Sequence, residues 1–265
     1  MVIGILVGAL VVGAIGVFIG VFLGVAGIKF KVEIDERQER IQASLPGNNC
    51  GGCGYAGCSG LAAAIVKGEA PANACPVGGA SVAQTISEIM GVEVSDTEPM
   101  VAFVHCQGDC HKARNDYEYT GAQDCRMLAF VPGGGPKSCN NGCLGYGTCV
   151  KECPFDAIHI VDGVAVVDKQ ACKACGKCVA VCPKHLISLV PKSKEIHVAC
   201  SSTEKGPVAM KACDTACIGC SLCVKNCPNE AIKVENLHAV MDYEKCTSCG
   251  VCMTKCPKGA IIKSE

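Results

Sequence analysis

The chain has 265 residues, of which 25 are cysteine and 31 glycine, while its aromatic residues are five Tyr and six Phe with no Trp. This length allows two or three domains. Few bulky side chains remain to build an ordinary core, so a group bound by the cysteines must supply part of it. The net charge is −1 and the sequence holds no block of basic residues. Composition therefore gives no indication of nucleic-acid binding, and we expect none.

The N-terminal segment, residues 1–28, is apolar and glycine-rich, and the first charged residue is Lys29. As a helix it is long enough to cross a hydrocarbon core of about 30 Å. A cleaved signal peptide would instead need a basic start and a small-residue cleavage site. Glycines at positions 4, 8, 16, 20 and 24 recur at intervals of four within two stretches, which favours close packing against other membrane helices over a lone anchor. We predict a single transmembrane helix in the lipid bilayer.

We expect the helix to lie in the cell membrane and the rest of the chain to lie in the cytoplasm, for two reasons. Lys29 and Lys31 flank the C-terminal end of the helix, as the positive-inside rule requires. Most cysteines come in C-x-x-C groups and their number is odd, which in a reducing compartment is typical of metal ligands rather than disulfides.

A four-cysteine motif follows the predicted membrane helix, in a domain that we expect over residues 29–98. Residues 32–45 read as a charged amphipathic helix, ended by Pro46 and Gly47. The motif then has the spacing C-x2-C-x4-C-x16-C and comprises Cys50, Cys53, Cys58 and Cys75. Four thiolates suit either zinc or a [4Fe–4S] cluster, and the glycines between them, which leave amides free to approach sulfur, favour the cluster. Gly52-x-Gly54-x-x-Gly57 matches a dinucleotide-binding pattern, but no strand precedes it, so we reject that interpretation.

The C-terminal part carries the C-x2-C-x2-C-x3-C-P pattern of bacterial two-cluster ferredoxins, in which each fourth cysteine binds the other cluster. The last two runs are Cys217, Cys220, Cys223 and Cys227-Pro228, then Cys246, Cys249, Cys252 and Cys256-Pro257. The crossed pattern predicts one cluster on Cys217, Cys220, Cys223 and Cys256, and a second on Cys246, Cys249, Cys252 and Cys227.

An earlier copy of this module lies 74 residues upstream, which indicates a tandem duplication. The corresponding residues are Cys143, Cys149, Cys153-Pro154, Cys172, Cys175, Cys178 and Cys182-Pro183. Tyr146 stands where the second copy has Cys220, and we expect Cys139 to supply the missing ligand through a rearranged loop. One cluster would then use Cys139, Cys143, Cys149 and Cys182, and its neighbour Cys172, Cys175, Cys178 and Cys153. A three-iron or unstable site is the alternative.

Five cysteines remain outside these sets: Cys106, Cys110, Cys125, Cys200 and Cys213. Val104-x-Cys106 and Val198-x-Cys200 look like corresponding strands at the start of the two copies. We prefer buried structural thiols for these residues, with an additional cluster between residues 106 and 139 as the alternative. The expected count is therefore five [4Fe–4S] clusters, or six if that alternative holds.

Together these patterns predict an α+β protein with one transmembrane helix, a small helical [4Fe–4S] domain and two tandem ferredoxin-type double-cluster modules. We place the modules at residues 139–192 and 193–265, after an intervening segment at 99–138, with β-hairpins over 158–167 and 232–241. Iron–sulfur clusters exchange electrons whereas zinc is redox-inert, so several clusters in one chain indicate an electron relay. No catalytic acid, base or nucleophile and no flavin or nicotinamide motif stands out.

This order of parts resembles the RnfB family, the iron–sulfur subunits of the Rnf complex, which is an ion-translocating ferredoxin:NAD oxidoreductase of bacterial membranes. The resemblance covers the whole chain, and Cys50, Cys53, Cys58 and Cys75 match the family's membrane-proximal cluster residue by residue. It implies a subunit that accepts electrons from soluble reduced ferredoxin and passes them to membrane subunits, and eventually to NAD, while Na⁺ or H⁺ is moved. Shorter members carry one two-cluster module, so the duplicated module is a departure that suggests a longer relay.

Other interpretations remain open at the level of sequence. A membrane-anchored polyferredoxin that wires a hydrogenase or formate dehydrogenase would share the ferredoxin-type runs, but it need not carry the motif at residues 50–75. A zinc-holding scaffold would bind zinc without sulfide. A corrinoid-activating iron–sulfur protein should carry a large partner domain.

Overall fold

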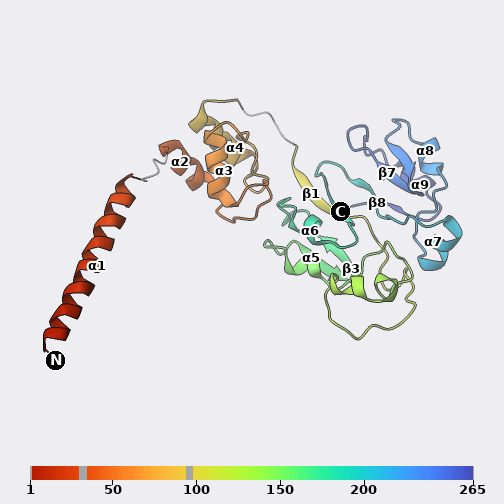
Figure 1. The fold of residues 1–265 in the computed structure, drawn as a ribbon. Helices are drawn as coiled ribbons and strands as arrows, with labels where there is room; N and C mark the ends of the chain where they lie inside the picture. The colour runs from red at the N-terminus through yellow and green to blue at the C-terminus, as the bar shows by residue number, and fades with distance from the viewer. Residues whose placement is uncertain (1, 30–34, 94–97, 265) are drawn as a thin grey trace.

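The computed structural model describes residues 2–29, 35–93 and 98–264. Three parts follow one another along the chain: an N-terminal helix, a small helical unit, and a larger region of short strands and helices (Figure 1). The two gaps in this description separate these parts. Residues 32–34 of the predicted amphipathic helix therefore lie outside the described residues.

Helix α1 (Val2–Lys29) has the length and composition of a membrane span. Its 28 residues extend about 42 Å at 1.5 Å per residue. The stretch Leu6–Gly27 has a mean hydropathy of 2.7, and none of its residues is buried against the rest of the chain. Such a large exposed apolar surface needs a bilayer or partner helices to cover it.

The helical unit consists of α2 (Glu36–Ser44), α3 (Gly57–Val66) and α4 (Gly79–Met90). Asp35 begins α2 as its N-cap, because its carboxylate accepts a hydrogen bond from the amide of Arg37 at 2.8 Å. Ile41, Leu61 and Ile86, one from each helix, are fully buried in a common core. Gly91 ends α4 with φ of 67°, a conformation that glycine adopts without strain. This packing fixes the loop between α2 and α3, which carries Cys50 and Cys53, while Cys58 lies in the first turn of α3.

The larger region contains two copies of one arrangement: an outer strand, a helix, a hairpin, a second helix and a closing outer strand. The first copy comprises β1 (Met100–Val104), α5 (Thr148–Lys151), β2 (Ile158–Val161), β3 (Val164–Val167), α6 (Lys177–Val181) and β4 (Ile187–Pro191). The second comprises β5 (Ile196–Val198), α8 (Leu222–Lys225), β6 (Ile232–Glu235), β7 (His238–Met241), α9 (Val251–Lys255) and β8 (Ile261–Lys263). Three further helices lie between these elements: η1 (Met127–Phe130), η2 (Pro132–Gly134) and α7 (Gly206–Ala212).

The strands of the described residues form four two-stranded antiparallel sheets. Hairpins β2–β3 and β6–β7 have the predicted bounds, with Ile158 opposite Val167 and Ile232 opposite Met241. The outer strands pair across each copy, β1 with β4 and β5 with β8. Both strands expected from the Val-x-Cys sequences are thus present. Because β1 pairs with β4, the segment 99–138 is structurally part of the first copy rather than only a connection.

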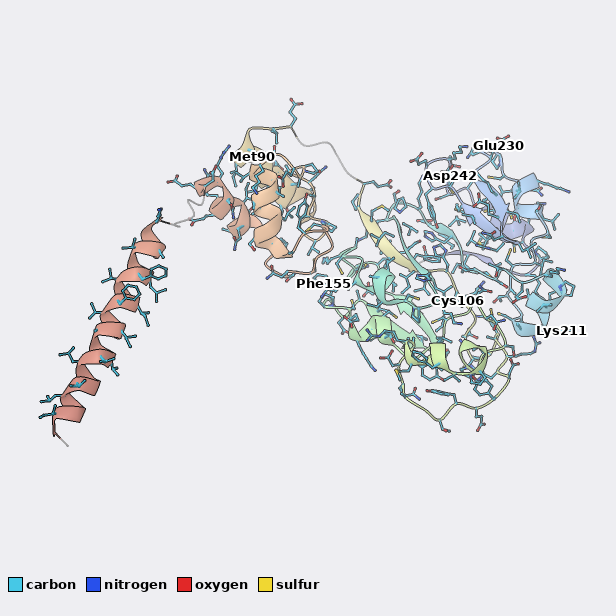
Figure 2. The ribbon with its side chains drawn as sticks, in the orientation of Figure 1. Met90, Cys106, Phe155, Lys211, Glu230 and Asp242 are labelled. Carbon is cyan, nitrogen blue, oxygen red and sulfur yellow. The ribbon has the colours of Figure 1, made fainter. Side chains whose placement is uncertain are left out.

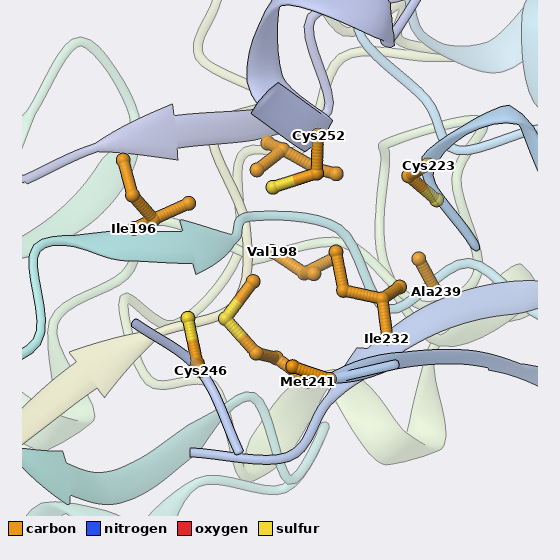
Figure 3. Close-up of a cluster of buried hydrophobic side chains, with 10 residues drawn as sticks. Ile196, Val198, Cys223, Ile232, Ala239, Met241, Cys246 and Cys252 are labelled. Carbon is orange, nitrogen blue, oxygen red and sulfur yellow. The ribbon is translucent and has the colours of Figure 1, made fainter. Parts of the chain in front are cut away.

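The interior of each copy is built around cysteine side chains, which replace the bulky residues that the composition lacks. In the second copy Cys223, Cys246 and Cys252 are buried together with Ile196, Val198, Ile232 and Met241. Figure 3 shows these apolar side chains together with the three cysteines that line the same interior. A core of this size and composition needs a bound group to fill the space between the thiols.

Candidate metal sites

The membrane-proximal motif forms one set of four thiols, which we call the Cys50 site (Cys50, Cys53, Cys58 and Cys75). Cys53, Cys58 and Cys75 pack against the core of the helical unit. Burial raises the pKa of the Cys75 thiol, and the nearby charges of Cys58 and Cys50 raise it further. Asn49 shapes the loop, because its side-chain oxygen accepts the amide hydrogen of Cys58 at 2.8 Å. The structure thus brings these cysteines together as the sequence predicts.

The second copy contains two four-thiol cavities with the crossed composition expected from the ferredoxin pattern. The Cys217 site is lined by Cys217, Cys220, Cys223 and Cys256. The Cys249 site is lined by Cys227, Cys246, Cys249 and Cys252. Helices α8 and α9 carry Cys223 and Cys252 inward, and the Cys-Pro pair at the end of each run lines the cavity of the other run.

The first copy repeats one of these sites without change. The Cys175 site is lined by Cys153, Cys172, Cys175 and Cys178, which are the counterparts of the four cysteines at the Cys249 site. The loop that carries Cys175 is held by left-handed backbone at Ala174 (φ 52°) and Gly176 (φ 76°). Ser248 and Gly250 flank Cys249 in the same conformation.

The other cavity of the first copy differs from the prediction in one ligand. It is lined by Cys143, Cys149, Cys182 and Cys125, and we call it the Cys143 site. Cys125, and not Cys139, occupies the position left by Tyr146; the assignment of Cys139 to this set was wrong. The buried Thr148 explains the geometry: its hydroxyl accepts the amide hydrogen of Cys125 at 2.8 Å and donates to Asp124 at 2.9 Å. Tyr146 instead packs edge-on against Tyr119.

Cys139 belongs to a fifth cavity of the strand-rich region, which lies between the two copies. This central site is lined by Cys106, Cys139, Cys200 and Cys213. Each copy supplies two thiols, since Cys139 and Cys213 are 74 residues apart and Cys106 and Cys200 follow the corresponding strands β1 and β5. Figure 2 shows Cys106 in the middle of the region formed by the two copies.

Backbone amides donate hydrogen bonds to the sulfur atoms of these sites in a regular pattern. In all four Cys-Pro runs of the ferredoxin-type copies the amide four residues after the cysteine points at its Sγ, from Ala157, Leu186, Ala231 and Ala260 at 3.3–3.4 Å. At the central site the Sγ of Cys106 accepts from Gly108 at 3.4 Å. Amide donors of this kind stabilise thiolate charge and tune the potential of an iron–sulfur cluster.

Burial raises the pKa of the most enclosed thiols. The pKa of Cys149, Cys178 and Cys200 is raised to about 12, in each case mainly by burial. Several buried thiolates so close together need a cationic group between them, because burying unpaired like charges is costly. Binding of such a group displaces the thiol protons.

The donor sets fit [4Fe–4S] clusters. Each of the six sets offers four thiols, and 24 of the 25 cysteines belong to one of them. Amide donors to sulfur and a cysteine-lined apolar interior complete the environment that such clusters require. The remaining thiol, Cys110, is exposed and lies with His111 and Asp162 so that their ligand atoms are within 4.8 Å of one another.

Neighbouring sites are joined by short backbone contacts. The amide of Cys143 donates to Sγ of Cys106 at 3.4 Å, and the amide of Cys217 donates to Sγ of Cys200 at 3.2 Å. The central site is therefore in direct contact with the Cys143 site on one side and the Cys217 site on the other. At the outer end of the first copy, a Cβ added to Gly52 would lie 2.5 Å from the carbonyl oxygen of Cys175. That contact joins the Cys175 site to the Cys50 site.

The sequence prediction of ligands omitted four cysteines that line these cavities: Cys106, Cys125, Cys200 and Cys213. The corresponding strands before Cys106 and Cys200, and the 74-residue spacing of Cys139 and Cys213, were signals for three of them. Cys125 has no counterpart in the second copy and no recurring spacing, so no sequence signal pointed to it.

The fold and these cavities define an iron–sulfur electron-transfer protein with two ferredoxin-type dicluster units and a further four-cysteine domain. The comparisons with family models agree: residues 136–183 and 216–260 each match a 4Fe-4S dicluster domain. Residues 45–77 match the family model "FeS", which describes an Fe-S cluster.

Whole-chain similarity gives the particular family. The chain is 49% identical over 247 residues to the B subunit of the Na(+)-translocating ferredoxin:NAD(+) oxidoreductase complex of Acetobacterium woodii, covering 93% of this chain and 74% of that protein. It is 41% identical over 237 residues to the B subunit of the ion-translocating oxidoreductase complex of Methanosarcina acetivorans, covering 89% of each. A proton-translocating relative from Clostridium ljungdahlii is 44% identical over 220 residues, covering 82% of this chain and 77% of that protein. The chain belongs to the RnfB family of the ion-translocating Rnf complexes, and it is an iron–sulfur electron-transfer subunit.

Proposed function

We propose that this chain accepts electrons from reduced soluble ferredoxin and delivers them to the membrane subunits of an ion-translocating ferredoxin:NAD⁺ oxidoreductase. Its relatives carry that activity in their names. The observation that supports the proposal is the continuous series of four-thiol sites. From one end it runs through the Cys249, Cys217, central, Cys143, Cys175 and Cys50 sites, and the last of these lies in the helical unit that comes next after α1 in the chain.

The chain would hold six [4Fe–4S] clusters, one in each set of thiols. When bound, each cluster takes up and releases one electron at a potential that depends on nearby amides, charges and burial. The central site would connect the clusters of the two copies, because it lies where the copies meet. Cys106 and Cys139 from the first copy and Cys200 and Cys213 from the second hold the two halves of the series together.

Helix α1 would cross the cell membrane once, with the iron–sulfur domains on the cytoplasmic side. Lys29 at its C-terminal end supports this orientation. Glycines at positions 4, 8, 16, 20 and 24 leave open space around their Cα atoms, which suits close approach by helices of other subunits. Either Na⁺ or H⁺ is compatible with this arrangement, since the relatives include both kinds.

The number of clusters is tested by iron, sulfide and zinc analysis of protein purified without oxygen. Six clusters predict about 24 iron and 24 sulfide atoms per chain with negligible zinc. About 20 iron atoms would exclude the central cluster or another of the six. Stoichiometric zinc without sulfide would contradict the electron-transfer function altogether.

The direction of transfer is tested in the whole complex with Cys53→Ala. We expect ferredoxin to reduce the clusters of the two ferredoxin-type copies as in the wild type, while NAD⁺ reduction is lost. Normal NAD⁺ reduction by this variant would show that the Cys50 site does not lie between ferredoxin and the membrane subunits. Cys110→Ala is the matched control, because Cys110 belongs to none of the six sets.

A further inference from the structure

The two outermost sites of the strand-rich region are built by the same loop in the two copies. These are the Cys175 loop (residues 173–177) and the Cys249 loop (residues 247–251), which are 74 residues apart. In each loop the residue before the cysteine and the glycine after it have left-handed backbone conformation. Each carries the second cysteine of its run to the cavity. The loops therefore share their backbone conformation, although Lys173 and Lys177 of the first loop stand where the second has Thr247 and Val251.

Their surroundings differ. In the first copy the loop is covered by the helical unit, because Gly52 approaches the backbone of Cys175 so closely that a Cβ there would lie 2.5 Å from the carbonyl oxygen and 3.0 Å from the Cα. The charge of Cys50 also contributes to the pKa of the Cys175 thiol, which burial raises. Figure 2 places Phe155, which lines the Cys175 site, on the side of the helical unit.

In the second copy the equivalent loop is open. Cys249 is exposed, whereas Cys175 is half-buried. Thr247 and Asn229 at the mouth of the Cys249 site are exposed as well, and Asn229 donates a hydrogen bond to the Thr247 hydroxyl at 2.7 Å. No residue of the Cys249 loop is charged, and none of the residues that line the site is charged either. The charged group that contacts the base of the loop is the Lys194 ammonium, which donates to the carbonyl oxygen of Cys246.

We propose that the Cys249 loop is the docking surface for the external electron donor, a small iron–sulfur protein, and that it presents to that partner the same backbone turn that the Cys175 loop presents to the Cys50 site. The shared turn supports this occupant, because the covered loop already faces another four-cysteine unit. In the transfer, the donor loses one electron and this chain gains one, with no bond made or broken. The proposal rests on the proposed function, since it takes ferredoxin as the donor.

The Cys217 site is the competing point of contact. Cys220 is exposed too, and the nearby Leu222 is 41% exposed. However, the Cys217 site lies inside the series, next to the central site through the contact between Cys217 and Cys200. Docking there would bypass the Cys249 site and leave it without a neighbour on its outer side. The Cys249 loop is therefore the end of the series that faces outward.

The experiment measures binding of an oxidised bacterial two-cluster ferredoxin to the full chain with its clusters, by calorimetry without oxygen. Thr247→Tyr places a ring over the mouth of the Cys249 site without removing a ligand, and Asn229→Tyr does so from the opposite side. We expect each to raise the Kd by about tenfold, the size of effect that loss of close contact at the centre of an interface produces. Leu222→Tyr is the matched control beside the Cys217 site and should leave the Kd unchanged. Iron content shows that each variant keeps its clusters.

The outcomes separate this proposal from the proposed function. If Leu222→Tyr weakens binding and the Thr247 and Asn229 variants do not, the donor docks over the Cys217 site and the proposal is overturned. If ferredoxin reduces the wild type but none of these variants changes the Kd, the proposal also fails while the proposed function stands. If ferredoxin neither binds nor reduces the wild type, the proposed function itself fails. Self-association of the wild type that Thr247→Tyr abolishes, with ferredoxin binding unchanged, would overturn the proposal by showing that a second copy of the chain covers the loop.

Discussion

The amide nitrogen of Cys217 lies 3.2 Å from the sulfur of Cys200 and donates a hydrogen bond to it. Cys217 lines one metal site and Cys200 the next, so the two sites are separated by one hydrogen bond. The first copy has the same relationship between the amide of Cys143 and the sulfur of Cys106, at 3.4 Å. Because each copy joins one of its own sites to the central site in this way, the central site forms the junction of a single series of sites.

The assignment of Cys125 and Cys139 to different sites predicts additive losses of iron. Cys125→Ala should remove iron from the Cys143 site, and Cys139→Ala should remove iron from the central site. The double variant should then lose the sum of the two single losses, about eight atoms if both clusters are lost entirely. Iron and sulfide analysis measures this, with Cys110→Ala as the control that loses none. A double variant that loses no more than either single variant would place both thiols in one site.

Lys137 provides a positive charge between the central site and the Cys143 site. Its ammonium donates to the carbonyl oxygens of Gly108 and Gly163 at 2.7 and 2.9 Å. Burial raises the pKa of Cys139 and Cys143, and the Lys137 charge opposes that increase at both thiols. A nearby cation favours the reduced, more negative form of a cluster, so Lys137→Met should lower the midpoint potentials of these two sites by an amount on the order of 50 mV.

Redox titrations followed by electron paramagnetic resonance measure these potentials. The control is Lys151→Met, because the Lys151 ammonium donates to the carbonyl oxygen of Gln123 at 3.0 Å on the exposed surface. Equal shifts in the two variants would indicate a general effect of net charge rather than the position of Lys137.

Position 219 requires glycine for two reasons: its backbone is left-handed, and the carbonyl oxygen of Leu237 leaves no room for a Cβ. Its φ is 65°, and an added Cβ would lie 2.8 Å from the carbonyl oxygen of Leu237 in the β6–β7 turn. Gly259, in the same copy, has φ of 62° with nothing within 4 Å of an added Cβ. Gly259→Ala should therefore cost only the conformational strain of about 1 kcal/mol. Gly219→Ala should cost roughly 2 kcal/mol more, because the hairpin must shift.

Thermal bleaching of the cluster absorbance in oxygen-free buffer compares these two variants. The midpoint temperature should fall clearly further for Gly219→Ala than for Gly259→Ala. Similar midpoints would show that the hairpin turn yields without cost.

His197 makes the fold sensitive to acid. It is fully buried and stacks on Phe103 with ring centroids 4.3 Å apart. Its Nδ1 forms a hydrogen bond with the Tyr243 hydroxyl at 2.9 Å, and its Nε2 has no hydrogen-bond partner among the described residues. Its pKa is lowered to about 4, mainly by burial and also by the charges of Lys169 and His105. Because the folded-state pKa lies below the unfolded value of 6.5, the neutral His197 ring does not reduce the stability of the fold above pH 6.5. As the pH drops from 6.5 toward 4, protonation of His197 in the unfolded state lowers the free energy of unfolding.

The loss at about pH 5 should amount to at most about 2 kcal/mol. Cluster bleaching measured between about pH 8 and pH 5 should show a smaller decrease of the midpoint temperature for His197→Phe than for the wild type. Equal decreases in both proteins would assign the acid sensitivity to the clusters themselves.

The order of parts and most of the cysteine sets follow from the sequence by itself. Spacing within a run determines which cysteines share a loop, and the proline after each fourth cysteine marks the crossed partner, so three ferredoxin-type sets and the Cys50 set could be assigned from local pattern. The unbroken apolar stretch before Lys29 likewise defines α1 through length and composition alone.

Only the tertiary structure decided where Cys125 and Cys139 lie and how the sites are connected. Thr148 holds Cys125 in the Cys143 site by a hydrogen bond that spans 23 residues of sequence, which no spacing rule anticipates. The central site needs thiols from residues 106 and 213, which meet because β1 and β5 begin equivalent copies that pack against each other. Contacts this distant along the chain arise from packing of whole modules, whereas sequence motifs report only the residues that one loop brings together.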